Sequence, residues 1–279
     1  MKQFTHFLNG TFVSEQKIRI SPRDLGFARG YAVHDFIVTY NHKPFRLTEH
    51  IDRLYKSASI IGLRMSWEKT QLMKWAEETF AQNDRDMEKT MRIYVTGGES
   101  TSLRQMDNPT LLMMVADRVF YPLEVYEKGV AVKAINHRRP YPAVKSNFYI
   151  AGVSELSKPG NETIAEVIFY DDTQIFEGAG SNLFAMIDDV LITPATNIVE
   201  GITRNTILEI VRLPIPVEVR DITFETLARA QEIFLTGSHS EVRGVVRLND
   251  VAVGDGTVGA VTQEVARQYK HYISTVCGS

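Results

Sequence analysis

The sequence predicts an α+β protein built from two domains. Its 279 residues are long for one hydrophobic core and suit two. The first part combines two hairpins with two amphipathic helices, whereas the second half is richer in short strands. The hydrophobic fraction of 44% and the charged fraction of 23% are ordinary for a globular protein in water.

The N-terminal domain is expected over residues 1–118. An Asn9-Gly10 dipeptide, which favours a tight hairpin turn, joins the first two strands. Thr48 is the expected N-cap of the first helix, whose apolar residues recur on one face. From the N-terminus, the hairpins, helices and strands expected in this domain span residues 7–13, 35–47, 48–61, 67–81, 91–96 and 110–116.

A linker is expected at residues 119–123, where Tyr121-Pro122 interrupts the chain and periodicity is weak. The C-terminal domain is then expected over residues 124–279. Its strands are expected at residues 130–135, 164–170, 183–187, 190–193, 217–219 and 232–236. Its helices are expected at residues 145–157, 203–211, 223–230 and 261–273.

Composition and charge argue against several classes of function. The formal net charge of −3, from 31 basic and 34 acidic residues, gives no general attraction for nucleic acid or an anionic membrane. Cys277 is the only cysteine, which rules out a disulfide framework. The sequence also lacks the apolar stretches of a signal peptide or a membrane span. We therefore expect a cytoplasmic protein.

Three other kinds of site are poorly supported. Residues 254–259 match a GxGxxG pattern, but too few residues follow to complete a dinucleotide-binding unit, so we expect a turn there. The seven histidines show no metal-ligand spacing. Ser238-His239-Ser240 is not part of a GxSxG elbow. We therefore expect neither a metal site nor a hydrolase triad.

The most informative stretch runs from residue 177 to residue 204. Glu177 is expected to end a strand at a turn of small residues, where its carboxylate can point into a cavity. Gly201-Ile202-Thr203 opens a helix whose free N–H groups and hydroxyl could hold a phosphate. A small molecule that carries both a protonated ring nitrogen and a phosphate would match this pair.

Five motifs occur in one order along nearly the whole chain. They are residues 29–35, 49–54, 144–146, 177–184 and 201–204. With these motifs the chain resembles the class IV (fold-type IV) pyridoxal 5′-phosphate (PLP) enzymes. That family includes D-amino-acid aminotransferases, branched-chain aminotransferases and aminodeoxychorismate lyases. One departure is that the stretch between Thr193 and Val199 is slightly shorter than in the family.

The resemblance also implies a fold and an assembly. The fold is a smaller N-terminal α/β sandwich-like domain followed by a larger C-terminal domain with a β-barrel-like core. The assembly is a homodimer, because a loop of the partner subunit completes the family's active site. The partners of such an enzyme are small amino acids and 2-oxo acids.

The resemblance assigns the cofactor contacts residue by residue. Lys145 would form the Schiff base with PLP, and Glu177 would pair with the ring nitrogen. Arg53 would bind the phosphate, although a helix-surface pair with Glu49 is the alternative. A solvated lysine and a solvated glutamate are the corresponding alternatives for the first two. The remaining cofactor contacts that the resemblance implies are Tyr149, Ile202, Thr203, Gly237 and Ser238.

The substrate side of the site is less constrained. Arg29 and Arg92 are the candidate partners of the substrate carboxylate, and Tyr31 is a candidate for the pocket wall. A structural ion pair for Arg92 and core packing for Tyr31 are the alternatives. Residues 97–99 read Gly-Gly-Glu and lack the arginine and histidine of the best-known D-amino-acid aminotransferases.

The resemblance favours a transaminase that moves the amino group of a D-amino acid to 2-oxoglutarate or pyruvate. This resembles a less common group of D-amino-acid transaminases that hold the carboxylate with arginines. An L-selective, branched-chain-type transaminase and an aminodeoxychorismate lyase are the alternatives, because the cofactor permits both chemistries and the pocket decides. A protein that only binds a ligand is a further alternative.

Overall fold

The computed structural model describes residues 2–103 and 108–278 and has the predicted α+β fold. The chain forms two compact units. The first consists of Met1–Val119, Val144–Phe148 and Cys277–Ser279. The second consists of Phe120–Ala143 and Tyr149–Val276. The short segment that carries Lys145 therefore packs with the first unit, and the linker at residues 119–123 stays a prediction.

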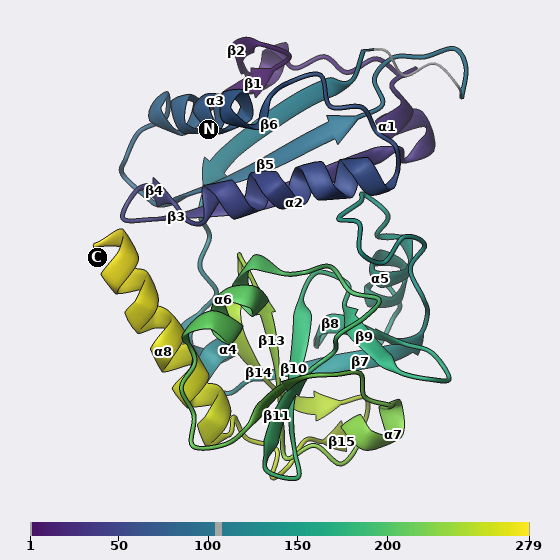
Figure 1. Ribbon diagram of the computed structural model, residues 1–279, viewed down its shortest axis with the longest axis vertical. Helices are drawn as coiled ribbons and strands as arrows, with labels where there is room; N and C mark the ends of the chain where they lie inside the picture. The colour runs from purple at the N-terminus through teal and green to yellow at the C-terminus, as the bar shows by residue number, and fades with distance from the viewer. Residues whose placement is uncertain (1, 104–107, 279) are drawn as a thin grey trace. The chain divides into compact units, whose positions relative to one another are not determined.

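The first unit is an antiparallel sheet with two long helices on one face (Figure 1). Within the described residues its strands follow the order β2-β1-β6-β5-β3-β4. The strands are β1 (Thr5–Leu8), β2 (Thr11–Ser14), β3 (Ala32–Tyr40), β4 (Lys43–Pro44), β5 (Lys89–Thr96) and β6 (Thr110–Asp117). The helices are η1 (Glu15–Lys17), α1 (Leu25–Arg29), α2 (Leu47–Ile60) and α3 (Lys69–Ala81).

The core of the first unit lies between the sheet and the helices α2 and α3. Val33 and Ile37 of β3 and Ile93 of β5 belong to one buried cluster with Leu54 of α2 and Leu72 of α3. Because side chains alternate across a strand, the residues between them lie on the opposite face of the sheet. Strand alternation thus separates a helix-covered core from a second face.

The predicted start of α2 was wrong by two residues. Arg46, with a left-handed φ of 53°, is the N-cap residue, and the helix begins at Leu47 instead of after Thr48. Leu47, the first residue of the helix, is buried in the core. Arg46 also pairs with Glu49 in the first turn, with 2.8 Å between Nη1 and Oε1.

The second unit is a mixed sheet that curls into a half-barrel (Figure 1). In the described chain its strands follow the order β12-β11-β10-β13-β14-β7-β8-β9, and β15 pairs with β14. The strands are β7 (Val130–Asn136), β8 (Ile164–Tyr170), β9 (Ile175–Gly178), β10 (Asn182–Ile187), β11 (Val190–Thr193), β12 (Val217–Val219), β13 (Glu232–Gly237), β14 (Glu241–Leu248) and β15 (Val251–Ala252). The helices are α4 (Leu123–Glu127), α5 (Ile150–Leu156), α6 (Ile202–Ile210), α7 (Phe224–Leu227) and α8 (Ala260–Cys277).

The helix predicted at residues 145–157 is shorter than expected. It is α5, which begins only at Ile150. The backbone of Lys145 is engaged elsewhere: its N–H donates to Ser57 Oγ at 3.1 Å, and its carbonyl accepts from the His34 N–H at 2.9 Å. These bonds hold the segment beside β3 and prevent a helical turn there.

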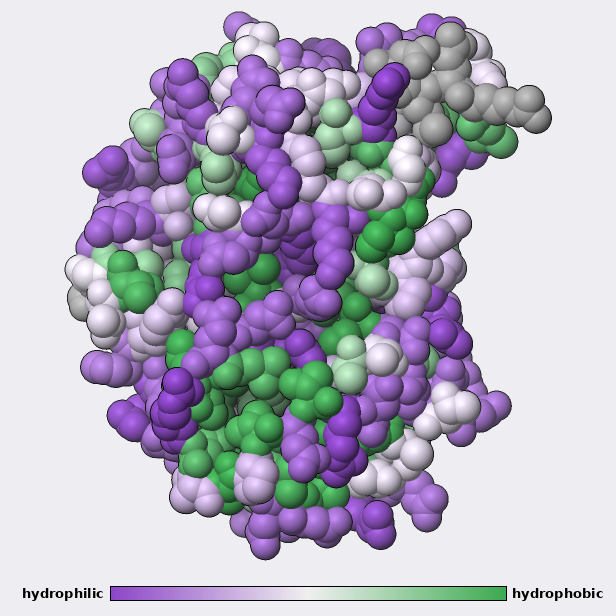
Figure 2. Space-filling model, in the orientation of Figure 1, coloured by the Kyte–Doolittle hydropathy of each residue, from purple (hydrophilic) through white to green (hydrophobic). Residues whose placement is uncertain are grey.

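Part of the sheet in the second unit is not covered by helices. Figure 2 shows apolar side chains gathered around β11 on the face in view. Val217 and Val219 of the edge strand β12 are 36% and 50% exposed.

Among the helices in residues 2–103 and 108–278, none combines the length and apolar character that crossing a membrane requires.

Candidate active site

Glu177, at the end of β9, is a buried carboxylate held by three donors of the second unit. Its Oε2 accepts from Asn182 Nδ2 at 2.9 Å and from the Val199 N–H at 3.0 Å. Its Oε1 pairs with Nη2 of Arg139, which also donates to the carbonyl of Pro142 at 2.8 Å. The carboxylate is thus fixed as an acceptor between an amide, a backbone N–H and a guanidinium.

Asn182 connects Glu177 to the N-terminus of α6. Its Nδ2 also donates to the carbonyl of Val199 at 2.8 Å. A Cβ on Gly201 would lie 1.9 Å from Asn182 Oδ1, so only glycine fits at this N-cap. Gly201 brings no side chain to cap α6, and the first residues of the helix, Ile202 and Thr203, are buried. The amides of this helix end therefore remain open to an anion.

The end of β13 lies beside this helix end. Thr236 of β13 pairs with Asn182 of β10 in the sheet register. Its Oγ1 is buried and has no hydrogen-bond partner among the residues that the structure describes. Gly237 and Ser238 follow directly. A buried hydroxyl without a partner beside an uncapped helix end indicates a ligand that supplies the missing bonds.

These groups of the second unit fit PLP. A buried carboxylate suits a protonated ring nitrogen, and the open N-terminus of α6 with the hydroxyls of Thr203 and Ser238 suits a phosphate. The described chain contains no group of three His, Cys, Asp or Glu side chains that could hold a metal ion.

Lys145 belongs to the first unit and is half-buried. Its charge is close enough to affect two histidines of that unit. Burial, together with the charge of Lys145, lowers the pKa of His34 to about 3. Burial lowers the pKa of His50 as well. The charge of Lys145 lowers this pKa further, whereas the neighbouring carboxylate of Asp35 raises it. Lys145 therefore lies beside two histidine side chains that stay neutral, and its own backbone is held in place by hydrogen bonds.

Arg53 is bound by Asp35, not by Glu49. Its Nε and Nη2 donate to the two oxygens of Asp35 at 2.9 and 2.7 Å, and His50 Nδ1 lies 2.6 Å from the same carboxylate. Burial alone would raise the pKa of Asp35, but Arg53 and His50 outweigh it and hold that pKa well below its usual range. The carboxylate thus orients the guanidinium, and the contact of Arg53 with a phosphate stays a prediction.

The predicted substrate residues also lie in the first unit, and within the described residues no hydrogen bond or ion pair joins them. Arg92 is exposed, with its guanidinium 5.6 Å from the ring centroid of Phe36, and forms no ion pair within residues 2–103 and 108–278. Arg29 is the exposed last residue of α1. Tyr31 donates to the carbonyl of Ile61 at 3.0 Å. The structural ion pair considered for Arg92 is therefore not found.

Sequence reasoning missed several residues of the second-unit site. Arg139 and Thr236 were not predicted, and Asn182 was placed only within a motif. The only sign of Arg139 in the sequence was its position as a basic residue directly before the loop at residues 140–142. Tyr149, a predicted cofactor contact, is the N-cap residue of α5.

Comparisons with known proteins agree with this geometry. The family model of class IV aminotransferases matches residues 32–248. A D-alanine aminotransferase of Staphylococcus aureus (strain COL) is 29% identical over 280 residues, covering 96% of this chain and 98% of its own. A putative branched-chain-amino-acid aminotransferase of Methanocaldococcus jannaschii is 30% identical, with 95% and 94% covered. A crystal structure of the branched-chain aminotransferase of Thermoproteus uzoniensis with norvaline superposes with a TM-score of 0.88 at 26% identity, covering 99% and 96% of the two chains.

Proposed function

This chain belongs to the class IV aminotransferases, which use PLP, and we propose that its amino donor is a D-amino acid. The acceptor in this proposal is a 2-oxo acid such as 2-oxoglutarate or pyruvate. The observation that carries it is the full-length similarity to the D-alanine aminotransferase of S. aureus. Arg92 is exposed and has no ion-pair partner in the described chain. Its position therefore supports the proposal that its guanidinium binds a substrate carboxylate.

The residues proposed to hold the cofactor lie in both units. Glu177 would accept a hydrogen bond from the ring nitrogen, and Tyr149 would donate to the ring oxygen. Arg53 and Thr203 would bind the phosphate. The other phosphate contacts in this proposal are Ile202, Gly237 and Ser238. When bound, the cofactor stores the electron pair that remains after the substrate Cα loses its proton.

Lys145 is the residue proposed to hold the cofactor and to accept the Cα proton at Nζ. Its backbone is anchored through Ser57 and His34. A lysine acts as a base only when its amine is neutral. The neighbouring histidines, whose pKa values are lowered, add no positive charge at neutral pH.

Arg29 and Arg92 are the proposed partners of the substrate α-carboxylate, with Tyr31 in the pocket wall. A guanidinium binds a carboxylate with two parallel hydrogen bonds, which fixes the orientation of the substrate. That orientation decides for which enantiomer the Cα–H bond points toward the base, and hence which enantiomer reacts.

Half-reactions test the donor. The PLP-loaded enzyme is mixed separately with D-alanine, D-glutamate and L-leucine, and loss of the visible absorption band of the lysine-bound cofactor is followed. We expect loss with the D-amino acids. Loss with L-leucine and none with either D-amino acid would contradict the proposal.

A branched-chain-type L-transaminase is the second candidate. The similarities to the M. jannaschii and T. uzoniensis proteins favour it about as strongly as the S. aureus protein favours the first. The L-leucine arm of the same experiment identifies it. Pyruvate release from aminodeoxychorismate with a persistent visible band would identify a lyase instead.

The proposed enzyme is a cytoplasmic homodimer in which Arg29 serves the partner's site. The exposed position of Arg29 at the end of α1 supports this part of the proposal. Mixing inactive Lys145→Ala and Arg29→Ala variants under conditions of subunit exchange should restore activity, because each hybrid dimer regains one intact site. If Arg29 acted within its own chain, every site would keep one lesion and activity would stay absent.

A further inference from the structure

Asp24 is a buried aspartate of the first unit that has no assigned role. It is 1% exposed and is the N-cap residue of α1. Its Oδ1 accepts from the Gly26 N–H at 2.8 Å, and its Oδ2 accepts from Thr96 Oγ1 and Thr110 Oγ1, both at 2.7 Å. A carboxylate at this depth needs hydrogen bonds that replace those of water, and these three donors supply them.

The three hydrogen bonds connect α1 to two strands of the sheet. Thr96 is the last residue of β5 and Thr110 is the first residue of β6, and the two are paired in the sheet register. Figure 1 shows α1 at this end of the sheet. A Cβ on Gly26 would lie 2.5 Å from Cγ2 of Thr96, so α1 lies directly against β5. One carboxylate therefore fixes the start of α1 to the ends of both strands.

Apolar packing gives α1 little support. Of its five residues, all of which the structure describes, Leu25 alone is buried, and Phe27 is 76% exposed. A helix this short is not stable on its own in water. The position of α1 therefore depends on polar anchors, which are Asp24 and the Leu25 N–H that donates to the carbonyl of Gly98 at 2.9 Å.

Arg29 is the last residue of α1 and lies between two anchored points. On its N-terminal side, Asp24 fixes the first turn of the helix. On its C-terminal side, the Gly97 N–H donates to the carbonyl of Tyr31 at 3.1 Å, and the Tyr31 hydroxyl donates to the carbonyl of Ile61 at 3.0 Å. Because Tyr31 has anchors of its own, loss of the Asp24 carboxylate should displace Arg29 more than Tyr31.

We propose that Asp24 is a positioning residue for the substrate. By fixing α1 to β5 and β6, it holds Arg29 in the place from which the guanidinium binds the substrate α-carboxylate. This inference rests on the proposed function, which assigns Arg29 to that carboxylate. A guanidinium forms two parallel hydrogen bonds with a carboxylate only when the two planes are aligned. A displacement of about 1 Å is enough to weaken such a contact severely.

Binding of an unreactive monocarboxylate tests this role without turnover. Calorimetry measures butyrate binding to the PLP-loaded wild type, Asp24→Ala, Arg29→Ala and the double variant. Each single substitution should weaken butyrate binding by about tenfold, the size of a charged hydrogen-bond contribution. The double variant should bind butyrate no more weakly than Arg29→Ala, because Asp24 acts through Arg29. Unchanged binding in Asp24→Ala, or losses that add in the double variant, would overturn the inference.

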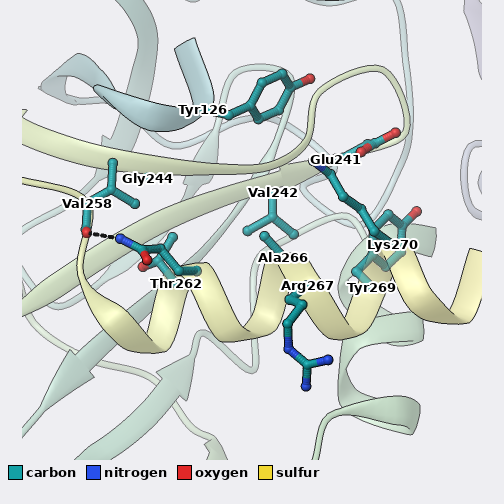
Figure 3. Close-up of a pocket in the computed structure, with 11 residues that line it drawn as sticks. Tyr126, Glu241, Val242, Gly244, Val258, Thr262, Ala266, Arg267, Tyr269 and Lys270 are labelled. Carbon is teal, nitrogen blue, oxygen red and sulfur yellow. Dashed lines mark hydrogen bonds between the residues drawn. The ribbon is translucent and has the colours of Figure 1, made fainter. Parts of the chain in front are cut away.

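Glu232→Ala is the matched control for Asp24→Ala. The Glu232 carboxylate also caps a helix, and it also has three donors: the Val261 N–H, the Thr262 N–H and Thr262 Oγ1. Thr262 belongs to the second unit, where it lines a cavity between β14 and α8 (Figure 3). Both substitutions should lower the urea midpoint, but only Asp24→Ala should weaken butyrate binding. Equal weakening by the two would show a general loss of stability and would overturn the role of Asp24.

Two conservative variants keep the test decisive if Asp24→Ala does not fold. Asp24→Asn should retain butyrate binding, since asparagine is an equally good N-cap and the threonine hydroxyls can accept from its amide. Thr110→Val removes one donor to Oδ2 and should weaken butyrate binding, though by less than Arg29→Ala. Its control is Thr262→Val, which removes a hydroxyl that donates to Glu232 at the same distance, 2.7 Å. Normal butyrate binding in Thr110→Val would refute the inference.

The half-reactions separate this inference from the proposed function, because butyrate has no stereocentre. Reaction with D-alanine together with additive losses in the butyrate cycle would overturn only the role of Asp24. Reaction with L-leucine alone together with non-additive losses would overturn only the proposed donor. Unchanged butyrate binding in Arg29→Ala would overturn the assignment of Arg29 to the α-carboxylate, and the role of Asp24 with it.

Discussion

Glu177 receives hydrogen bonds from three separate segments of the second unit. Asn182 comes from β10, Val199 from the loop before α6, and Arg139 from the loop before α5. Only Asn182 lies close to Glu177 in the sequence. At the scale of single residues, the motif predicted the carboxylate and its place at a strand end, whereas the fold decided which donors hold it.

Arg139→Gln removes the cation that is paired with Glu177. Both side chains are largely buried, at 11% and 5% exposure, so the variant leaves a buried carboxylate without its partner. We expect a loss of about 3 kcal/mol in the free energy of unfolding, measured by urea denaturation. Arg220→Gln is the control, because Arg220 pairs with Glu218 at the surface and should change stability by at most about 1 kcal/mol. Equal effects of the two substitutions would contradict the prediction.

Lys145→Ala tests the residue proposed to hold the cofactor. We expect the visible band of the lysine-bound cofactor to disappear and turnover to fall by several orders of magnitude, because both the covalent anchor and the base are lost. Lys158→Ala is the control, since Lys158 is 58% exposed and pairs with Glu155. Turnover near the wild-type level would refute the assignment.

At the scale of elements, the N-terminus of α8 is capped by a carboxylate from β13. Oε1 of Glu232 accepts from the Val261 N–H at 3.0 Å, and Oε2 accepts from the Thr262 N–H at 2.8 Å. The carboxylate occupies the space beside Gly259, where a Cβ would lie 2.0 Å from Glu232 Cδ. Gly259 is the last glycine of the GxGxxG match and directly precedes α8. The need for space beside the capping carboxylate therefore explains why this position is a glycine.

A double-mutant cycle tests this cap. Glu232→Ala should cost about 1 kcal/mol in the free energy of unfolding, as for other lost helix caps. Gly259→Ala should also destabilise, because the new methyl group clashes with the carboxylate. The double variant should lose less than the two single losses added, since removal of the carboxylate leaves room for the methyl group. Additive losses in urea denaturation would show that Gly259 and Glu232 do not interact.

Elements with clear local patterns were predicted, and those without them were missed. The Asn9-Gly10 hairpin, the paired strands of the first unit and the helix α8 lie close to the predicted positions. The strand β14 was missed because Arg243, Gly244 and Arg247 interrupt its apolar pattern. Its position is set by pairing with β13 across a short turn and with β7, and the contact with β7 is non-local.

At the scale of the whole molecule, acid should weaken the fold through buried groups of the first unit. Burial and nearby charges lower the pKa of His34 to about 3, below its ordinary value of 6.5. A histidine with a lowered folded pKa stabilises the fold at high pH, and this contribution is lost as pH falls below the unfolded value. Asp35, whose pKa is also lowered, adds a loss as pH falls below its ordinary value of 3.8.

The pH dependence of stability tests this account. The urea midpoint of the wild type should fall as pH is lowered from 6.5 to about 3. His34→Gln has no group that titrates at this position, so its midpoint should fall less over the same range. Identical pH profiles of the two proteins would contradict the role of His34.

The sequence by itself determined the α+β class and the cofactor family. Both depend on short-range features: strand alternation, the helix start at Gly201 and the strand end at Glu177. Such features survive in a linear pattern because backbone hydrogen bonding and side-chain periodicity repeat over a few residues.

Only the tertiary structure decided which side chains meet. It placed Lys145 beside β3, paired Arg53 with Asp35 instead of Glu49, and brought Arg139 to Glu177. It also buried Nε of Arg243 without a hydrogen-bond partner among the described residues. These partners are far apart in the chain, and sheet pairing brings them together, so no spacing in the sequence records them.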